Sequence, residues 1–299
     1  MLLQNLSVWN QCIEATINTY NFSSGGGIGM IPWVAAVIAL FIWWFSTGTI
    51  LLAVKYADRA GRRARVNTTL IGLPLVVLGV CGAIWSQSHI DILGTYVAFL
   101  SALALWGWIE LAFLTGIITG PNCAPLPKNV PEWERFIRAW GTLAYHEMLL
   151  AATLIGLGVL LWHAPNAFAL WTFAVLFFAR VSAKLNLFLG VPRINVDFLP
   201  DALGHLASHF RIASLNWLFP ISVTVLTFAV ACWLERLYAS QTMGEITGFA
   251  LLTALTALAA LEHWVMVLPI PDEKLWRWML PTPKTTPEQQ TNQGGHHGL

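Results

Sequence analysis

The sequence predicts an all-α fold, a polytopic transmembrane helical bundle of about seven spans. Its composition does not resemble that of a soluble domain, because 57% of the 299 residues are hydrophobic and only 10% are charged, against about 25% charged residues in soluble domains. The mean hydropathy is +0.63. The apolar residues fall in blocks of about 20, the length with which a helix crosses a hydrocarbon core of about 30 Å.

Each apolar block is expected to be helical, because backbone groups in lipid must form their hydrogen bonds within the segment, and these long runs lack the alternation of a membrane β-barrel. The order of the blocks predicts a periplasmic N-terminal tail over residues 1–31, a membrane-embedded domain over 32–280 and a disordered cytoplasmic tail over 281–299. The expected spans cover residues 32–54, 69–86, 92–119, 142–162, 167–190, 216–236 and 245–269.

Basic residues predict the orientation, because loops rich in Lys and Arg stay on the cytoplasmic side. With seven spans, 15 of the 16 Lys and Arg residues fall on one face and Arg236 falls on the other. An odd number of spans fits this asymmetry and an even number does not. We therefore expect the N-terminus to be periplasmic and the C-terminus to be cytoplasmic.

Several classes of function have no support in the sequence. The net charge is +1, and no basic stripe with interleaved aromatic residues suggests nucleic-acid binding. The four cysteines form no C-x-x-C pair, so neither a disulfide framework nor a metal site is predicted. No P-loop, G-x-S-x-G, H-E-x-x-H or dinucleotide fingerprint is present. We therefore do not expect an enzyme.

Ionisable residues inside the spans form a predicted intramembrane polar cluster, because such residues are costly in lipid and need partners. Its members are Glu110, Glu147, Arg180, Lys184 and Glu262. Arg180 and Lys184 are one helical turn apart, so they share a face and can each meet a carboxylate. In the simplest interpretation, these residues form ion pairs that fix the register of the helices.

A ligand site is the alternative interpretation of the same region. His146, Glu147, Glu262 and His263 are candidate cofactor-binding residues, because a neutral histidine can bind the central metal of a tetrapyrrole. Adjacent residues point to different sides of a helix, so each His and Glu pair is expected to offer one member inward. A proton relay through these residues is a third possibility.

A second pair of histidines, His205 and His209, lies outside the expected spans. The preceding Pro200 and Asp201 suit the first turn of a short helix. Residues four apart share a face of an α-helix, and this segment also has an apolar side. The sequence therefore predicts an interfacial helix with both histidines on one face.

Five segments of the sequence resemble one family. They are residues 113–121 (FLTGIITGP), 145–149 (YHEML), 164–171 (APNAFALW), 182–200 (SAKLNLFLGVPRINVDFLP) and 261–278 (LEHWVMVLPIPDEKLWRW). The resemblance is to the photosynthetic complex assembly protein 2 family, also called PuhE. Its most specific part, called the AKLNLFLGVP motif below, consists of Ala183, Lys184, Leu185, Asn186, Leu187, Phe188, Leu189, Gly190, Val191 and Pro192.

This resemblance implies a biological setting that composition does not supply. Such proteins are encoded beside the reaction-centre H subunit in purple phototrophic bacteria and are implicated in assembling reaction-centre and light-harvesting complexes and in bacteriochlorophyll supply. It implies an assembly factor in the bacterial cytoplasmic membrane, inner or intracytoplasmic. The expected partners are the lipid bilayer, photosynthetic subunits or the pigment-synthesis machinery. The candidate cofactor is bacteriochlorophyll or a precursor. The alternative is a tetrapyrrole-binding protein or enzyme that uses the intramembrane His and Glu residues.

Overall fold

The computed structural model describes residues 32–194 and 199–268, and all the regular secondary structure of these residues is helical. The predicted tails, residues 1–31 and 281–299, lie outside the described residues. The helices are α2 (Pro32–Ala60), α3 (Arg62–Ile71), α4 (Leu73–Ser86), α5 (Ile92–Leu114), α6 (Glu132–Gly141), α7 (Ala144–Leu160), α8 (Phe168–Leu189), the 3-10 helix η2 (Asp201–His209), α9 (Leu218–Ala239) and α10 (Met243–Val265).

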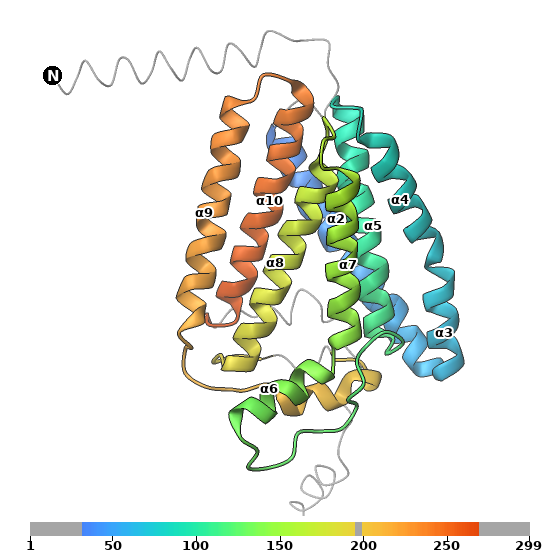
Figure 1. Ribbon diagram of the computed structural model, residues 1–299, viewed down its shortest axis with the longest axis vertical. Helices are drawn as coiled ribbons and strands as arrows, with labels where there is room; N and C mark the ends of the chain where they lie inside the picture. Colours follow the sequence, from blue (N-terminus) through green and yellow to red (C-terminus); the bar gives the residue numbers. More distant parts are fainter. Residues whose placement is uncertain (1–31, 195–198, 269–299) are drawn as a thin grey trace, which may run out of the picture.

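The described helices confirm a bundle of six to seven apolar spans (Figure 1). Six segments are long and apolar enough to cross a membrane. Five are the single helices α2, α5, α8, α9 and α10, and the sixth is formed by α3 together with α4. The seventh candidate, α7, has 17 residues and joins α6 at a bend of 68°. At 1.5 Å per residue it is about 26 Å long, and it runs beside α5 and α8.

Two regions differ most from the sequence prediction. The segment 55–68 was expected to be a loop, but α2 continues to Ala60 and α3 begins at Arg62. Charged residues made this segment look like a loop, yet its one break is Gly61, whose φ of 87° lets the chain reverse between the two helices. The third span was expected to reach residue 119, but α5 ends at Leu114, and Gly116 follows with a φ of 73°.

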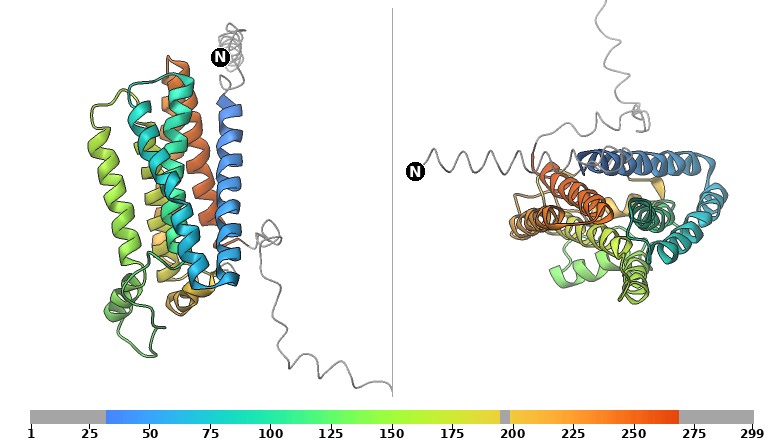
Figure 2. Two further views of the ribbon diagram at one scale, coloured as in Figure 1. Left: turned by 90° about the vertical axis from the view of Figure 1, so that its right-hand side faces the viewer. Right: turned by 90° about the horizontal axis from the view of Figure 1, so that it is seen from above.

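The bundle has two unlike ends. The basic end carries α3, α6 and η2, and every described Lys and Arg except Arg236 lies in that half of the bundle. The described chain enters the bundle at the opposite end, at Pro32, and leaves it at the basic end, at Leu268 (Figures 1 and 2). This arrangement fits an odd number of spans.

The opposite end is closely packed. In Figure 2, α5 lies in the interior, and it packs against α4, α8 and α10. Two glycines of α10 allow close approach: a Cβ at Gly244 would collide with the carbonyl of Ile90, and one at Gly248 with the ring of Phe168. Asp91 caps α5 by accepting from the amide of Gly94 at 2.7 Å.

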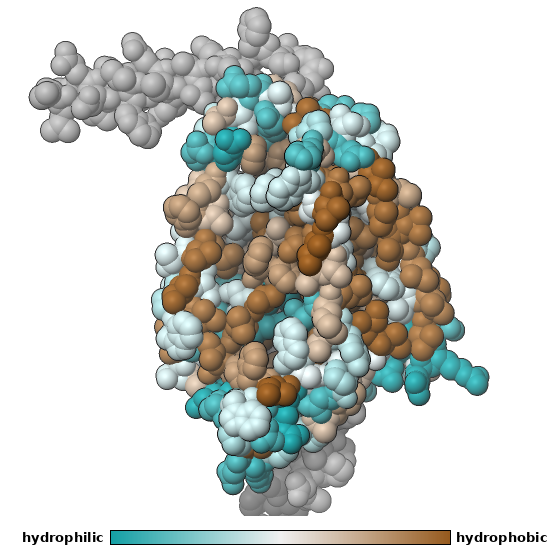
Figure 3. All heavy atoms as spheres, in the orientation of Figure 1, coloured by the Kyte–Doolittle hydropathy of each residue, from teal (hydrophilic) through white to brown (hydrophobic). Residues whose placement is uncertain are grey.

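The outer surface of the bundle is apolar. Figure 3 shows hydrophobic residues over most of its height, and large apolar side chains such as Phe45, Val77 and Val159 are 58%, 61% and 76% exposed. Exposed apolar surface on this scale is unlike that of a soluble monomer and matches helices whose solvent is lipid. The multi-pass membrane protein expected from the sequence is thus the one observed.

Helix α6 is amphipathic and lies outside the bundle. Trp133, Phe136, Ile137 and Trp140 are spaced as one helical face and are 67%, 47%, 57% and 47% exposed. On another face, Arg135 is buried against the bundle. Because α7 begins three residues after α6 ends, we expect α6 to lie at the boundary of the membrane, where an apolar face with tryptophans suits the headgroup layer.

The short helix η2 corrects the expectation for the second histidine pair. It is a 3-10 helix, in which residues three apart eclipse, so His205 and His209 do not share a face. His209 is buried, and its Nε2 donates to the carbonyl of Ala124 at 3.3 Å. Burial lowers the pKa of His209, which favours the neutral ring.

Contact of α6 with lipid gives a first prediction. A fluorophore on an Ile137→Cys variant lacking the native cysteines should be quenched by lipids that carry a nitroxide near the headgroup, because Ile137 lies on the exposed apolar face. The control keeps Cys123, an exposed residue of the preceding loop, as its one cysteine. We expect quenching at residue 137 to be several-fold stronger in the same proteoliposomes. Equal quenching at the two positions would exclude an interfacial α6.

Candidate functional site

Two ion pairs connect α8 to its neighbours near the basic end. Arg180 and Lys184 both project from α8, where the Nη2 of Arg180 donates to Oε2 of Glu110 on α5 at 3.1 Å. The Nζ of Lys184 donates to Oε1 of Glu147 on α7. The side chains of Glu110 and Glu147 are 10% and 8% exposed. The two basic residues therefore meet two different carboxylates, one turn apart on one helix.

His146 lies between these pairs. Its Nε2 is 3.8 Å from Oε1 of Glu110 and 3.9 Å from Oε1 of Glu147, and its fully buried ring lies 4.3 Å from the ring of Phe113, centroid to centroid. Both His146 and Glu147 are buried, whereas one inward member was expected. The reason is that α7 packs against both α5 and α8, so adjacent side chains reach different neighbours inside the protein.

Glu262 and His263 point to different sides of α10, as the sequence predicts. The Nδ1 of His263 is 2.8 Å from the carbonyl of Ala259, and its Nε2 is 2.9 Å from Oγ of Ser182 on α8. Because a carbonyl accepts only, Nδ1 carries the proton, and Nε2 accepts from the serine hydroxyl of Ser182. Both nitrogens of a neutral ring are thereby used. Glu262 instead faces a cavity and makes no hydrogen bond or ion pair with any residue in the described part of the chain.

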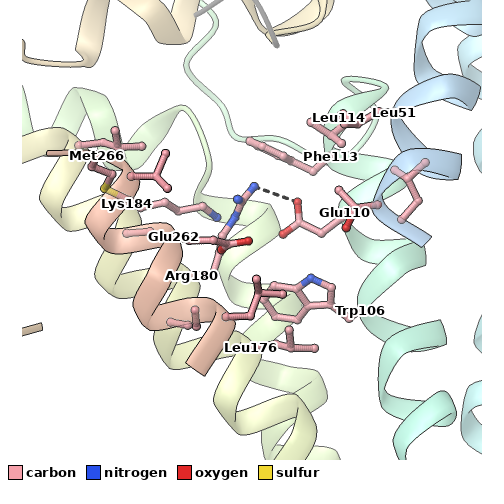
Figure 4. Close-up of a pocket in the computed structure, with 18 of the residues that line it drawn as sticks. Leu51, Trp106, Glu110, Phe113, Leu114, Leu176, Arg180, Lys184, Glu262 and Met266 are labelled. Carbon is pink, nitrogen blue, oxygen red and sulfur yellow. Dashed lines mark hydrogen bonds and ion pairs between the residues drawn. The ribbon is translucent and has the colours of Figure 1, made fainter. Parts of the chain in front are cut away.

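The structure thus brings four members of the predicted polar cluster into ion pairs, and Glu262 stays outside them. Figure 4 shows Glu262, Arg180 and Glu110 reaching into the same space from α10, α8 and α5. Arg180 is the more accessible partner of its pair, since 41% of its side chain is exposed. The accessible charged groups of the cluster are therefore Arg180 and Glu262.

The cavity has a volume of about 850 Å³, within the range of roughly 300–1,000 Å³ of small-molecule sites. It lies between α2, α5, α8 and α10 and extends to η2 at the basic end. Its charged lining is Glu110, Arg180, Lys184, Arg193 and Glu262, and much of the remaining lining is apolar, including Trp43, Ile50, Leu103, Trp106, Leu176 and Leu255.

The geometry does not suit axial ligation of a tetrapyrrole by the candidate histidines. Neither His146 nor His263 lines the cavity. His146 is enclosed against Phe113, and both ring nitrogens of His263 have hydrogen-bond partners. Glu147 is occupied by Lys184. Of the four candidate cofactor-binding residues, Glu262 alone faces the cavity, so a ligand there would meet a carboxylate and not an imidazole.

The AKLNLFLGVP motif forms the junction between α8 and the loop that leads to η2 and α9. Asn186 is fully buried, and its Nδ2 donates to Oγ of Ser222 on α9 at 2.9 Å. Gly190 has a φ of 123°, and a Cβ at this position would lie 2.9 Å from Cβ of Ala213. A side chain here would therefore strain the backbone and collide with the loop. Val191 pairs with Ile212 in a short parallel bridge.

Arg135 and Asn216 complete this junction, and sequence reasoning missed both. The Nη2 of Arg135 donates to the carbonyl of Phe188 at 2.6 Å, and its guanidinium lies 4.1 Å from the centroid of that ring. Asn216 donates to the carbonyl of Gly190 at 2.7 Å and accepts from the amide of Leu218 at 2.9 Å. The signal for Arg135 was present, since the residue falls opposite the apolar face of α6. The motif therefore holds α6, α8 and α9 together.

The buried ion pair gives a second prediction. Glu147→Ala should lower the free energy of unfolding by about 3–5 kcal/mol, because Lys184 then loses its counter-ion inside the protein. Denaturant titration in mixed micelles measures this change. Glu235→Ala is the control, since Glu235 is exposed on α9 and has no partner among the described residues, and it should change stability by less than about 0.5 kcal/mol.

The double variant Glu147→Leu with Lys184→Met distinguishes the pair from its parts. Removing both charges together should recover most of the stability lost in Glu147→Ala, because no uncompensated charge remains. A Glu147→Ala protein as stable as the Glu235→Ala control would show that the ion pair does not hold α7 to α8.

Comparisons with known proteins place the chain in a family. The family model described as "Protein of unknown function (DUF3623)" matches residues 30–287. A relative from Rhodobacter capsulatus, named "Uncharacterized 30.4 kDa protein in puhA 5'region", is 57% identical over 251 residues, which are 84% of this chain and 92% of the relative. No solved structure matches the chain. The protein is therefore a member of the DUF3623 family.

Proposed function

We propose that this protein is a non-enzymatic assembly factor for bacterial reaction-centre and light-harvesting complexes, acting in part through the supply of bacteriochlorophyll. The relative that is 57% identical carries this proposal, because its name places it in the 5' region of puhA. The resemblance to the PuhE family independently implies a gene beside that of the reaction-centre H subunit. Both observations point to a photosynthesis gene cluster.

The proposed working surface is the basic end of the bundle. It carries the longer connections, the amphipathic α6, the AKLNLFLGVP motif and the part of the cavity that η2 lines. Three arginines at the turn between α2 and α3, Arg59, Arg62 and Arg63, are exposed and have no ion pair with another described residue. Such a surface suits contact with the membrane-bound subunits or pigment-synthesis enzymes that an assembly factor would meet.

The orientation of this surface is a third prediction. Because basic loops stay in the cytoplasm, reporter fusions after Lys128 and His205 should be active as cytoplasmic reporters, and fusions after Ser88 and Ser240 as periplasmic ones. The N-terminus would then be periplasmic and the C-terminus cytoplasmic. A cytoplasmic signal from the fusion after Ser88 would reverse the proposed working side.

Loss of the protein gives a fourth prediction. A deletion strain should accumulate reaction-centre and light-harvesting complexes more slowly or to a lower level, while growth without light stays close to normal. Near-infrared absorbance of membranes, normalised to total protein and compared with a complemented strain, measures the effect. Unchanged complex levels across light and oxygen conditions would contradict the assembly role, and accumulation of one pigment precursor would favour an enzyme.

Lys184 and Leu185 of the AKLNLFLGVP motif differ in how a substitution would affect the fold. Charge reversal at Lys184 would place a new negative charge beside Glu147, so it should reduce the abundance of the protein itself. Leu185 is 37% exposed and can be changed without opening an ion pair. A Leu185→Gln protein at normal abundance should restore less complex than wild type if the motif contacts a partner, with abundance measured by immunoblot in the same membranes.

A pigment-binding protein is the second candidate function, and the cavity of about 850 Å³ is the observation that favours it. Tetrapyrroles are coloured, so the absorbance spectrum of protein purified from phototrophic membranes separates this candidate from the first. A stoichiometric pigment band would favour binding. Because His146 and His263 do not line the cavity, such binding would rest on Glu262 or on apolar contacts.

A further inference from the structure

Two charged groups of opposite sign in the cavity, Glu262 and Arg180, have hydrogen-bonding positions that no other described residue fills. Glu262 has no hydrogen bond or ion pair with any other described residue. Arg180 uses one Nη2 contact on Glu110, while its Nε is buried without a partner. An arginine offers five N–H donors and a carboxylate about four acceptor positions. The lining therefore offers both donors and acceptors to a bound molecule.

These two groups belong to a cavity whose other lining is largely apolar. Trp106 and Leu176 lie on one side of the polar groups, and Phe113 and Leu114 lie on the other, toward the basic end (Figure 4). Trp43 and Leu255 extend the apolar wall on α2 and α10. A ligand that fills this space must bury an apolar body and place a polar group beside Arg180 and Glu262.

The charges of the cavity residues indicate which charges the polar group of a ligand would carry. Glu110 and Arg180 neutralise each other, as do Glu147 and Lys184, so Glu262 is the carboxylate in excess within the cluster. Arg193, the remaining charged residue of the lining, donates to the carbonyl of Leu268. A simple anion would gain from Arg180 but would be repelled by Glu262. A simple cation would gain from Glu262 but would leave the free N–H groups of Arg180 without an acceptor. A head with both a cationic donor and an anionic oxygen satisfies both.

We propose that the cavity binds a zwitterionic amphiphile, with an ammonium or similar N–H group on Glu262, an anionic oxygen on Arg180 and an apolar body against the tryptophan and leucine wall. Both an aminophospholipid of the bilayer and a single-chain amphiphile have this chemistry. This inference is independent of the proposed role in photosynthesis, because it rests on the cavity alone and its test uses the purified protein.

Three probes with equal chains test the head chemistry: 2-aminododecanoic acid, dodecylamine and dodecanoic acid, each radiolabelled. Binding is measured by scintillation proximity to the protein in phosphatidylcholine nanodiscs, whose headgroup has no N–H donor, with empty nanodiscs as the measure of partition into lipid. We expect saturable binding of one 2-aminododecanoic acid per chain, at least tenfold tighter than that of the other two probes, because it alone meets both charged groups.

Substitutions at Glu262 and Arg180 test which group of the ligand contacts each residue. Glu262→Gln should weaken the amino acid probe and dodecylamine at least tenfold and leave dodecanoic acid no weaker, because the lost interaction is with the cationic group. Glu262 has no hydrogen bond or ion pair with another described residue, so this change should not unfold the protein. Glu235→Gln, the same substitution at an exposed position on α9, is the control and should bind all three as wild type. Arg180→Lys keeps the charge beside Glu110 and should weaken the two carboxylate probes.

Nanodiscs of phosphatidylethanolamine with the same acyl chains distinguish the two sources of ligand. If the bilayer supplies the ligand, the probe should bind at least tenfold more weakly there than in phosphatidylcholine, because the lipid competes for the site. Unchanged probe binding would assign the site to a non-lipid amphiphile. Equal affinity for the three probes, wild-type binding by Glu262→Gln, or uptake no different from empty nanodiscs would each overturn the proposal.

Discussion

The rest of the structure depends on two ion pairs formed by one turn of α8 inside the membrane domain. Arg180 holds Glu110 of α5, and Lys184 holds Glu147 of α7. Taking such charges out of water is costly, but leaving one of them unpaired costs more. We infer that the pairs act mainly on specificity, because they fix the rotation of three helices about their own axes. His146, between the two carboxylates, fills the space that this arrangement encloses.

The cavity follows from how the remaining helices pack around this centre. Helix α2 packs against α5 and α10, and its residues Trp43, Ser46 and Ile50 line the cavity together with residues of α8. The accessible side of Arg180 and the carboxylate of Glu262 lie in that cavity. Arg180 and Lys184 of α8 pair with carboxylates of α5 and α7, whereas α2 packs mainly against α5 and α10. Polar groups of α8 and α10 therefore lie in a cavity whose wall is otherwise largely apolar.

The sequence predicted the spans and the ion pairing well, because both depend on strong local signals. Long apolar blocks must be helical in lipid, and four-residue spacing places Arg180 and Lys184 together on any helix. The helical state of residues 55–68 was missed because charge and the absence of an apolar run look like a loop. Only the packing of α7 between α5 and α8 explains why His146 and Glu147 are both buried.

The candidate site was predictable only in part, for the same physical reason. Residue type marked Glu262 and His263 as equal candidates, but a difference of 100° around α10 sends one into the cavity and the other against Ser182. In the sequence, the motif carried the family resemblance and predicted no structural role. Its asparagine and glycine instead serve the junction between α8, α6 and α9, since Asn186 binds Ser222 and Gly190 admits the loop at Ala213.

The contrast between the two ends of the bundle has a mechanical consequence. At the opposite end Gly244 meets the carbonyl of Ile90, Gly248 meets Phe168, and Asn166 joins two loops by donating to the carbonyl of His89 at 2.7 Å. At the basic end the same helices enclose a cavity. The helices are thus held tightly together at one end of the bundle and separated by the cavity at the other. We therefore expect a change in what fills the cavity to move α6 and η2 more than the closely packed opposite end.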